Sequence, residues 1–454
     1  MTLPEDFTTY TRTLFGDELW QRFARGMEEE PPVSVRLNPY KFDATRMALP
    51  AAVKGRVEWC ERGRYLDGRP VFTLDPLLHA GAYYVQEAAS MYITKVIASY
   101  APADRPLLVL DLCAAPGGKS TALRSVLPEG SLLMANEPVR QRANILTENI
   151  LKFGHPDVVV TNCHAADYRR SGLLFDVVLA DVPCSGEGMF RKDEGAIREW
   201  SAAGVAKCAA LQREIISDIM PCLRDGGLLV YSTCTFNRHE DEDNVEFICR
   251  EWQTEKLEER HFIPGVTPTE GLYMAALRLP AESGQPDSTL SAAMATRQRR
   301  DKKQAKGGRQ TPAAAGAKVM SGWIDGAGDF DITMLGQHSV AVRRQWRGIF
   351  DTAVQKLRVM HAGISLGEQK GKDTVPSEGL ALSTRFNRGA FPEAELSREQ
   401  ALAYLRREPI ELPAGMPRGF VAVTYLGLPL GFVKNIGNRS NNLFPQEWRI
   451  RMKD

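Results

Sequence analysis

Residues 107–119 constrain the fold of this chain more than any other stretch. The run Leu-Leu-Val-Leu-Asp-Leu-Cys is followed by small residues, a proline and two glycines, and a helical pattern opens at Lys119. This order is typical of a buried parallel strand that turns sharply into a helix. Glycines there let backbone amides approach a ligand closely, and the helix N-terminus carries partial positive charge that favours a carboxylate or phosphate.

The spacing of this turn narrows the choice of ligand. It matches neither G-x-G-x-x-G nor G-x-x-x-x-G-K-[ST], which disfavours a dinucleotide and a nucleoside triphosphate. Taken alone, the turn is also compatible with an ordinary loop between a strand and a helix.

Two later strand ends also carry cysteines. An apolar strand at 175–180 runs into Asp181-Val-Pro-Cys-Ser-Gly-Glu-Gly, and another at 227–230 runs into Tyr231-Ser-Thr-Cys-Thr. The carboxyl ends of parallel strands line one edge of a sheet. We therefore expect four side chains to converge on one crevice: Cys113, Asp181, Cys184 and Cys234.

Strands and helices alternate from residue 107 onward, which predicts an α/β fold with a doubly wound, Rossmann-like parallel sheet. The expected strands are 107–113, 131–136, 157–161, 176–182 and 227–231. The expected helices are 119–127, 140–153, 201–223 and 239–250. Residues 271–279 read as a closing antiparallel strand.

The three motifs, in this order, resemble those of the Sun family of RNA 5-methylcytosine methyltransferases. Asp-Val-Pro-Cys-Ser-Gly together with Ser-Thr-Cys-Thr is a highly specific pair, and the resemblance of the core covers residues 36–279. The layout of the whole chain is similar to the RsmF-like ribosomal RNA branch of that family. The resemblance implies an enzyme that uses S-adenosyl-L-methionine to form 5-methylcytosine in RNA, with 16S ribosomal RNA as the expected substrate.

The family also implies catalytic roles. Carbon 5 of cytosine is a poor nucleophile until a thiolate adds at carbon 6, and the resemblance makes Cys234 that nucleophile. Addition puts negative charge on the pyrimidine at nitrogen 3, where Asp181 is placed to stabilise it. Cys184 would help to remove the carbon 5 proton and release the product, and Lys119 resembles the active-site lysine, although opening a helix is an alternative role.

The cofactor residues follow from the same resemblance. The turn should hold the methionine end, through Cys113, Ala114, Ala115, Pro116, Gly117, Gly118 and Lys119, with Asp181 beside it. Glu137, at the end of the second strand, is expected to bind the ribose hydroxyls. Asp167 resembles the acid that contacts adenine, with Asn162 and His164 close by in the sequence. Four other cysteines are expected to be small buried hydrophobes: Cys163, Cys208, Cys222 and Cys249.

Composition sets outer limits. A chain of 454 residues should divide into about three domains, and a formal net charge of +1 means that any RNA-binding surface is a local patch. Eight cysteines without a C-x-x-C pair, and an N-terminus without a signal-peptide pattern, favour the reducing cytoplasm. No apolar run suggests a membrane span, and no Cys and His cluster suggests a metal. A monomer is expected.

We predict this division of the chain: residues 1–100 as an N-terminal RNA-binding extension, 101–280 as the catalytic domain, 281–318 as a flexible basic linker, 319–379 as a small α+β module and 380–454 as a PUA-like RNA-binding domain. The linker concentrates Arg297, Arg299, Arg300, Lys302, Lys303, Lys306 and Arg309 against Asp301. Such a run could follow a phosphate backbone, or it could only keep the linker soluble.

The flanking regions give further expectations. Helices should span 5–28, 83–99, 350–359 and 397–406, with strands at 34–39, 339–343, 419–425 and 430–435. Candidate RNA contacts are Arg36, Gln86, Ser90, Arg439, Asn441 and Arg449, against the alternative that these are solvated surface residues. A polar, solvated helix face is the preferred interpretation for Gln86 and Ser90.

Three other functions stay open. A transfer RNA cytosine-5 methyltransferase would use the same chemistry on another RNA. A catalytically silent ribosome-assembly factor would need neither motif cysteine, and a DNA cytosine methyltransferase would use the Pro-Cys thiol as nucleophile without Ser-Thr-Cys-Thr.

Overall fold

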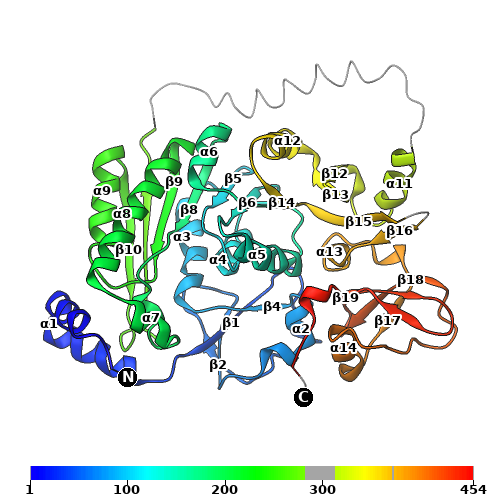
Figure 1. Ribbon diagram of the computed structural model, residues 1–454, viewed down its shortest axis with the longest axis horizontal. Helices are drawn as coiled ribbons and strands as arrows, with labels where there is room; N and C mark the ends of the chain where they lie inside the picture. The colour runs from blue at the N-terminus through cyan, green and yellow to red at the C-terminus, as the bar shows by residue number, and fades with distance from the viewer. Residues whose placement is uncertain (1, 282–311, 371–372, 453–454) are drawn as a thin grey trace.

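The computed structural model describes residues 2–281, 312–370 and 373–452. In these segments the chain forms four sheets: a large central one, a small one near the N-terminus and two in the C-terminal third (Figure 1). The cationic residues of the predicted linker, between 297 and 309, lie outside the described residues.

The large sheet confirms the predicted α/β architecture. Within the described residues it has eight strands in the order β10-β11-β9-β8-β5-β6-β7-β14. Strands β5 to β9 pair in parallel, whereas β10, β11 and β14 run antiparallel to their neighbours. The bounds are β5 Leu108–Asp111, β6 Leu132–Asn136, β7 Val158–Thr161, β8 Phe175–Asp181, β9 Leu223–Thr233, β10 Glu255–Phe262, β11 Leu272–Arg278 and β14 Val359–Ala362.

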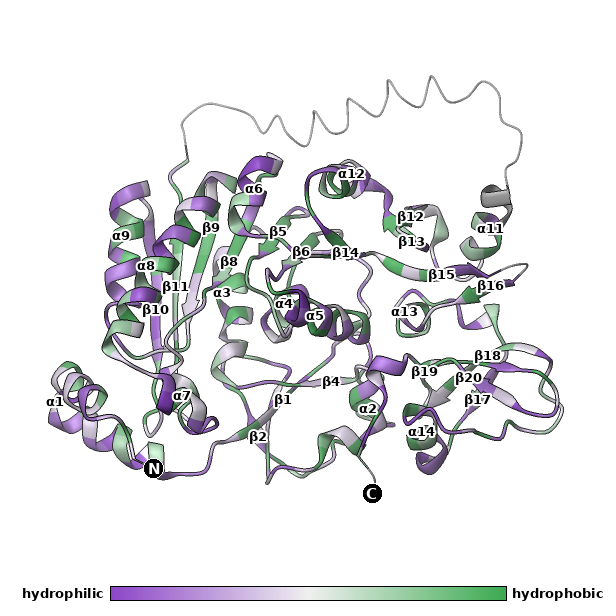
Figure 2. Ribbon diagram, in the orientation of Figure 1, coloured by the Kyte–Doolittle hydropathy of each residue, from purple (hydrophilic) through white to green (hydrophobic). Residues whose placement is uncertain are grey.

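Helices cover both faces of this sheet because successive strand residues point to opposite sides. Leu108 and Leu110 face one core, and Leu107 and Val109 face the other. The first core is covered by α6 (Ala165–Ser171), α8 (Ala202–Ile219), α9 (Glu242–Trp252) and α12 (Arg347–Lys356), and the second by α3 (Ile93–Tyr100), α4 (Gly118–Arg124) and α5 (Arg140–Phe153). Figure 2 shows the result: the central strands are largely hydrophobic, while hydrophilic residues lie on the outer helices.

Several elements of the catalytic region were missed or misjudged from sequence, among them α7 (Glu194–Glu199). Strand β10 pairs with β11 but was not predicted, because most of its residues are charged and only Phe262 is fully buried. Helix α6 was also missed, since it has only seven residues. The expected helix 201–223 ends at Ile219, where Pro221 in the next turn removes a backbone donor.

The N-terminal segment opens with α1 (Glu5–Glu28), which contains a kink at Gly16, where φ is 72°. A four-stranded sheet follows in the order β2-β3-β1-β4. Its strands are β1 Val33–Leu37, β2 Val53–Arg56, β3 Gly63–Leu66 and β4 Tyr83–Val85, with the short helix α2 (Pro76–His79) before β4. This sheet lies beside the catalytic sheet in Figure 1.

The predicted helix 83–99 is wrong in its first half. Residues 83–85 form β4, which pairs with β1 in the register Val35↔Val85, and α3 begins only at Ile93. The apolar stripe is nevertheless buried, because Ala89 and Tyr92 lie on a 3-10 turn that packs with Val96 and Ile97. Tertiary pairing with a distant strand overrides the local helical pattern here.

Residues 312–376 contain a further four-stranded sheet, in the order β12-β13-β15-β16, which is joined closely to the catalytic sheet. Its elements are α11 Pro312–Ser321, β12 Phe330–Leu335, β13 His338–Arg343, β15 Ile364–Lys370 and β16 Asp373–Pro376. Between them, α12 ends at Lys356 and β14 leaves the module to pair with β7 at the edge of the large sheet. The predicted helix 350–359 therefore continues too far, and its last residue, Val359, starts β14.

The C-terminal segment follows the sequence prediction. After α13 (Glu378–Ala381), helix α14 (Arg398–Leu405) begins at a capping box formed by Ser397 and Gln400, as expected. The sheet contains β17 Glu393–Glu395, β18 Gly419–Tyr425, β19 Leu428–Asn435 and β20 Ser440–Asn442. Whether the chain folds as units divided at the predicted boundaries stays a prediction.

A core tryptophan tests whether 338–362 stabilises the catalytic sheet. Trp346 is 5% exposed, its indole N–H donates to the Gly130 carbonyl at 2.6 Å, and it packs in the core beneath α12. We expect Trp346→Ala to cost about 3–5 kcal/mol of unfolding free energy, because it leaves a cavity. Calorimetry and hydrogen exchange of the β7 amides are the measurements.

The matched control is Met334→Ala on β12, since Met334 is 56% exposed. Its effect should stay within about 0.5 kcal/mol. If Trp346→Ala lowered protection in 312–376 and left β7 unchanged, the module would be energetically separate from the catalytic sheet.

Candidate active site

The candidate site lies where the order of the large sheet reverses. The chain moves from β5 outward to β6 and β7, then returns to the other side of β5 with β8, so β5 and β8 are neighbours that lead in opposite directions. Loops at the carboxyl ends of strands diverge at such a point and leave a crevice for ligands. The loops after β5, β8 and β9 carry the three sequence motifs.

The turn after β5 has the geometry that its glycines predict. Gly117 has φ +114°, and a Cβ there would lie 3.3 Å from the Leu146 side chain. At Gly118, where α4 begins, a Cβ would lie 3.3 Å from the ring of Tyr84. Substitution of Gly117 is strained and the backbone stays bare, so its amides are open to a ligand. The Ala115–Pro116 peptide bond is cis.

Two side chains from α5 hold this turn from outside. Asn149 donates to the Pro116 carbonyl at 2.8 Å, and Arg142 donates to the Ala115 carbonyl at 3.1 Å. Below the turn, Ser120 donates to the buried Asp111 carboxyl at 2.6 Å. Burial raises the pKa of Asp111 to about 7. The turn is therefore fixed by its neighbours before any ligand binds.

Glu137 follows β6 and is 1% exposed. One carboxylate oxygen, Oε1, accepts the Val139 amide at 2.9 Å, while Oε2 is buried without a hydrogen-bond partner. The nearest cation, Arg142, is 3.5 Å from Oε2. An unsatisfied buried acceptor beside the turn fits a ligand that brings hydroxyl donors. The ribose of S-adenosylmethionine has two such donors, so the residues present fit this cofactor.

Both carboxylate oxygens of Asp167 have partners within the protein. Its Oδ2 accepts the His164 amide at 2.9 Å, completing a capping box at the start of α6, and its Oδ1 pairs with Arg170. The carboxylate is part of the helix start, and its contact with adenine stays a prediction. Asn162, the neighbouring alternative, donates its amide to two backbone carbonyls, those of Glu137 and Pro138.

Lys119 and Asp181 form the ion pair of the site. The Lys119 ammonium donates to Asp181 Oδ2 at 2.9 Å, and both side chains are largely shielded from solvent. Burial alone would lower the pKa of Lys119, but the adjacent Asp181 carboxylate outweighs it and raises that pKa. Lys119 is therefore a charged partner of Asp181 as well as a residue in the first turn of α4.

The two motif thiols are brought together. Cys184 Sγ and Cys234 Sγ are 2.8 Å apart, both cysteines are free, and the Cys234 amide donates to Cys184 Sγ at 3.3 Å. The hydrogen bond with Cys234, together with burial, raises the pKa of Cys184 well above its usual value. Cys184 thus stays protonated at neutral pH.

Buried acids behind the thiols were not found from sequence. Glu187 accepts the Phe236 amide at 2.8 Å and the Trp200 indole at 3.0 Å, and Glu240 accepts the Ser185 amide at 3.0 Å and the Gln212 amide group at 2.7 Å. Asn237 donates to both acids. Burial raises the pKa of Glu187 to about 7.

These contacts join the loop that carries Cys184 to the loop that carries Cys234. Glu187 stands inside a motif that the sequence singled out, and Glu240 lies six residues after Cys234. Their positions close to the two motif cysteines were the signals that could have found them.

The other sequence candidates are scattered. Cys163 and Cys222 are buried as expected, whereas Cys208 and Cys249 are partly exposed, so the prediction was wrong for those two. Arg36 is 1% exposed and donates to Gln86 and to Thr121 of α4, which ties the N-terminal sheet to the catalytic domain.

Gln86 is 5% exposed, which contradicts the expected solvated face. Ser90, on the 3-10 turn, accepts the amide group of Gln86 at 3.0 Å.

The C-terminal candidates lie on the surface. Arg439 and Asn441 are exposed and line a groove of about 880 Å³ between β19, β20 and the 407–416 loop, and Arg449 is exposed outside that lining. Across the described segments, no three His, Cys, Asp or Glu side chains gather as a metal site, and no helix is long and apolar enough to cross a membrane.

Three family models match the chain. That of "16S rRNA methyltransferase RsmB/F" matches residues 98–286, the N-terminal domain of 16S rRNA methyltransferase RsmF matches 3–88, and the methyltransferase RsmF PUA domain matches 391–450. The chain is 30% identical to ribosomal RNA small subunit methyltransferase F of Escherichia coli O9:H4 (strain HS), covering 98% of this chain and 96% of that protein. The protein of the same name in Shigella sonnei (strain Ss046) is also 30% identical, with the same coverage.

Solved structures support the fold. NSun6 from Pyrococcus horikoshii, solved with SFG, is 20% identical with a TM-score of 0.51, covering 62% of this chain and 99% of that one. A methyltransferase homolog protein from the same organism is 24% identical, also with a TM-score of 0.51, covering 61% of this chain and all of that one.

The fold and the family matches define a methyltransferase that takes its methyl group from S-adenosylmethionine, and its relatives are named for ribosomal RNA. The chain belongs to the RsmB/F family of RNA methyltransferases, and it carries that family's RsmF N-terminal and PUA domains.

The carboxylate oxygen of Glu137 that accepts no hydrogen bond allows a test of cofactor binding. Glu137→Ala should weaken the binding of S-adenosylmethionine by about 1.5–3 kcal/mol, because a hydrogen bond from a hydroxyl to a charged acceptor is lost. This corresponds to a Kd that is roughly 10- to 100-fold higher. Titration calorimetry measures the Kd. Glu129→Ala is the control, since the Glu129 side chain is 87% exposed. Equal affinity of Glu137→Ala and wild type would remove Glu137 from the cofactor site.

Proposed function

We propose that this protein methylates carbon 5 of a cytosine in small-subunit ribosomal RNA, through a covalent bond between Cys234 and carbon 6. The observation that carries the proposal is that two free thiols, 2.8 Å apart, and the Lys119–Asp181 ion pair lie at the same edge of the sheet, where its parallel strands end. Relatives that are named for ribosomal RNA support the substrate. We also propose that it acts in the cytoplasm and as a monomer.

The first step is addition to the base. Cys234 attacks as a thiolate, its sulfur bonds to carbon 6, and the electrons of the 5,6 double bond move into the ring toward nitrogen 3. The proton for nitrogen 3 comes from the Lys119 ammonium: Lys119 donates it to the Asp181 carboxylate, and Asp181 passes it to nitrogen 3, which neutralises the developing charge. Carbon 5 is then enamine-like and nucleophilic.

S-adenosylmethionine supplies an electrophilic methyl group beside this carbon. The chain's own residues hold the donor: Glu137 takes the ribose hydroxyls, and the turn from Cys113 to Lys119 holds the methionine end. Asp181 lies between this turn and the position proposed for the base.

Release uses the second thiol. The hydrogen bond from Cys184 to Cys234, the main cause of the raised pKa of Cys184, is lost once the Cys234 sulfur is bonded to carbon. Cys184 then gives its thiol proton to solvent water, and the resulting thiolate accepts the proton from carbon 5. The carbon 6–sulfur bond breaks, the double bond re-forms, and nitrogen 3 returns its proton to Asp181.

RNA is proposed to contact the C-terminal domain as well. The groove lined by Arg439 and Asn441 is large enough for several nucleotides, and Arg439 offers a cation to a phosphate. A local site of this kind fits a chain whose net charge is only +1.

The two thiols should give different mutant phenotypes. Cys234→Ala should abolish methylation and form no adduct, since no thiolate remains to add at carbon 6. Cys184→Ala should allow attack and methyl transfer but impair release, so that protein accumulates on its RNA as a band that survives denaturing gel electrophoresis. If Cys184 were only a small packed residue, its substitution would cost some stability and produce no adduct.

The controls use the remaining cysteines. Cys249→Ala, at a partly buried position of α9 away from the two motif loops, should keep normal turnover. Normal turnover of Cys184→Ala, or an adduct in Cys234→Ala, would show that the assigned roles are wrong. Absence of 5-methylcytosine in RNA treated with the wild-type protein would contradict the proposed reaction itself.

The groove gives a salt-dependence test. Arg439→Ala should weaken RNA binding and reduce the slope of log K against log salt by about 0.7–0.9, the contribution of one phosphate contact. Fluorescence anisotropy at several salt concentrations measures both values, and S-adenosylmethionine affinity should not change. Arg12→Ala, on exposed α1, removes a cation elsewhere and is the comparison. An unaltered slope would exclude Arg439 as a phosphate contact.

A further inference from the structure

Asp241 stands at the N-cap of α9 but does not cap it. Aspartate is favoured at this position because its side chain accepts an amide of the first helical turn. In α9 no such bond is present, and the backbone of Asp241 has φ −99° and ψ −96°. The side chain is 0% exposed, so it forgoes the helix amides and is also withdrawn from water.

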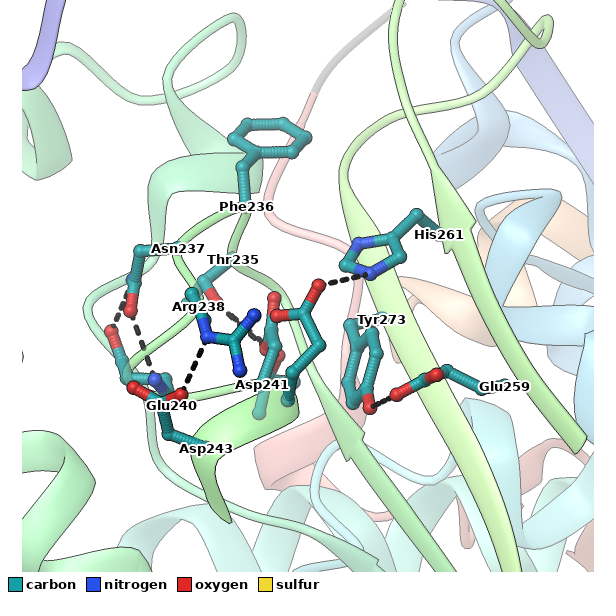
Figure 3. Close-up of polar contacts among 12 residues, drawn as sticks. Thr235, Phe236, Asn237, Arg238, Glu240, Asp241, Asp243, Glu259, His261 and Tyr273 are labelled. Carbon is teal, nitrogen blue, oxygen red and sulfur yellow. Dashed lines mark hydrogen bonds and ion pairs between the residues drawn. The ribbon is translucent and has the colours of Figure 1, made fainter. Parts of the chain in front are cut away.

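The carboxyl group is instead directed at the residues on either side of Cys234. Asp241 Oδ1 accepts the hydroxyl of Thr233 at 2.5 Å and the hydroxyl of Thr235 at 3.0 Å, and the two hydroxyl oxygens are 3.3 Å apart. Figure 3 shows the Asp241 side chain pointing toward Thr235 within the loop that follows Cys234. One oxygen therefore holds both neighbours of the proposed nucleophile.

The position matters because the backbone changes direction here. Thr233 is the last residue of β9, and Cys234 begins the loop. A side chain at a strand end is free to turn unless its neighbours are held, and both threonines are fully buried in this arrangement. The backbone of Cys234 has two further contacts, since its N–H donates to Cys184 Sγ at 3.3 Å and its carbonyl accepts the Gly188 amide at 2.8 Å. The buried acids Glu187 and Glu240 act further along the loop, on Phe236 and Asn237.

The surroundings of Asp241 disfavour its charged form. Burial, reinforced by nearby Glu242 and Glu187, raises the pKa of Asp241 well above its usual range, against the effect of the threonine hydroxyls. The facing charged groups are engaged elsewhere: Glu242 with His261, and Glu187 with Trp200 and Asn237. Oδ1 accepts both hydroxyls in either protonation state, and the other oxygen, Oδ2, is buried without a hydrogen-bond partner.

We propose that Asp241 is a positioning residue: by accepting the hydroxyls of Thr233 and Thr235 it fixes the turn that aims the Cys234 sulfur at carbon 6 of the base. This inference rests on the proposed function, because it assumes that Cys234 is the nucleophile. The part of Asp241 that matters is one acceptor oxygen. Asparagine supplies the same oxygen at the same distance, whereas alanine and serine do not reach the threonines.

The test measures adduct formation and methyl transfer in single turnover, with RNA that carries 5-fluorocytosine at the target to trap the adduct. Asp241→Ala should slow adduct formation by about tenfold or more, since misplacing a reacting group has effects of this size. Asp241→Asn should stay within about threefold of wild type, and S-adenosylmethionine affinity should be unchanged in both. Asp241→Ser keeps a residue favoured at the N-cap and should be as slow as Asp241→Ala.

Two comparisons separate positioning from stability. Ser201→Ala removes a real cap from α8, where Ser201 accepts the Gly204 amide, and should lower stability without slowing adduct formation. Thr235→Val removes one hydroxyl donor and keeps the side-chain shape, so it serves if Asp241→Ala fails to fold. The double variant Thr235→Val with Asp241→Ala should slow adduct formation by less than the two single variants combined, as expected for partners in one contact.

The outcomes are decisive in each direction. A wild-type rate for Asp241→Ala, or for Thr235→Val, would overturn the proposal. So would an Asp241→Asn variant as slow as Asp241→Ala, because the acceptor oxygen would then not be the important feature. A wild-type protein that forms no adduct would instead refute the proposed function, which keeps the two failures distinct.

Discussion

The pairing of β8 with β9 is the constraint on which the candidate site depends. Asp181 is opposite Ser232 in this parallel register, and the Val182 amide donates to the Ser232 carbonyl at 3.0 Å beyond the last paired residue. Cys184 and Cys234 therefore leave neighbouring strands at the same level. A slip of one residue would turn the side chains of one strand to the other face and separate the thiols.

The loops that follow these strands are held by buried acids rather than by tight turns alone. Glu187, Glu240 and Asp241 are each almost fully buried, which is unfavourable unless their oxygens find donors. Backbone amides, threonine hydroxyls, an indole and two side-chain amides supply most of those donors. A network satisfied in this way resists rearrangement, because moving either loop would leave a buried carboxyl group unpaired.

The flanking segments are built into the same body. Arg36 of the N-terminal sheet donates to Thr121 in the helix that follows the cofactor turn, and β14 extends the catalytic sheet beyond β7. Arg343 adds an ion pair with the buried Asp157, at 2.7 Å. Together these contacts hold the N-terminal sheet and residues 338–362 against the catalytic sheet.

The sequence by itself determined the parts of the protein that depend on local pattern. Alternating apolar strands and helices predicted the parallel sheet, and the glycine turn and the two cysteine motifs predicted the edge at which Cys113, Asp181, Cys184 and Cys234 meet. The capping box at Ser397 predicted the start of α14. Only the tertiary structure decided what depends on contacts between distant residues: β4 in place of a helix, β14 at the edge of the catalytic sheet, the burial of Gln86, and the turning of Asp241 away from its own helix. The physical reason is that strand pairing and burial of polar groups are set by partners far away in the chain, and these outweigh local preference wherever the two disagree.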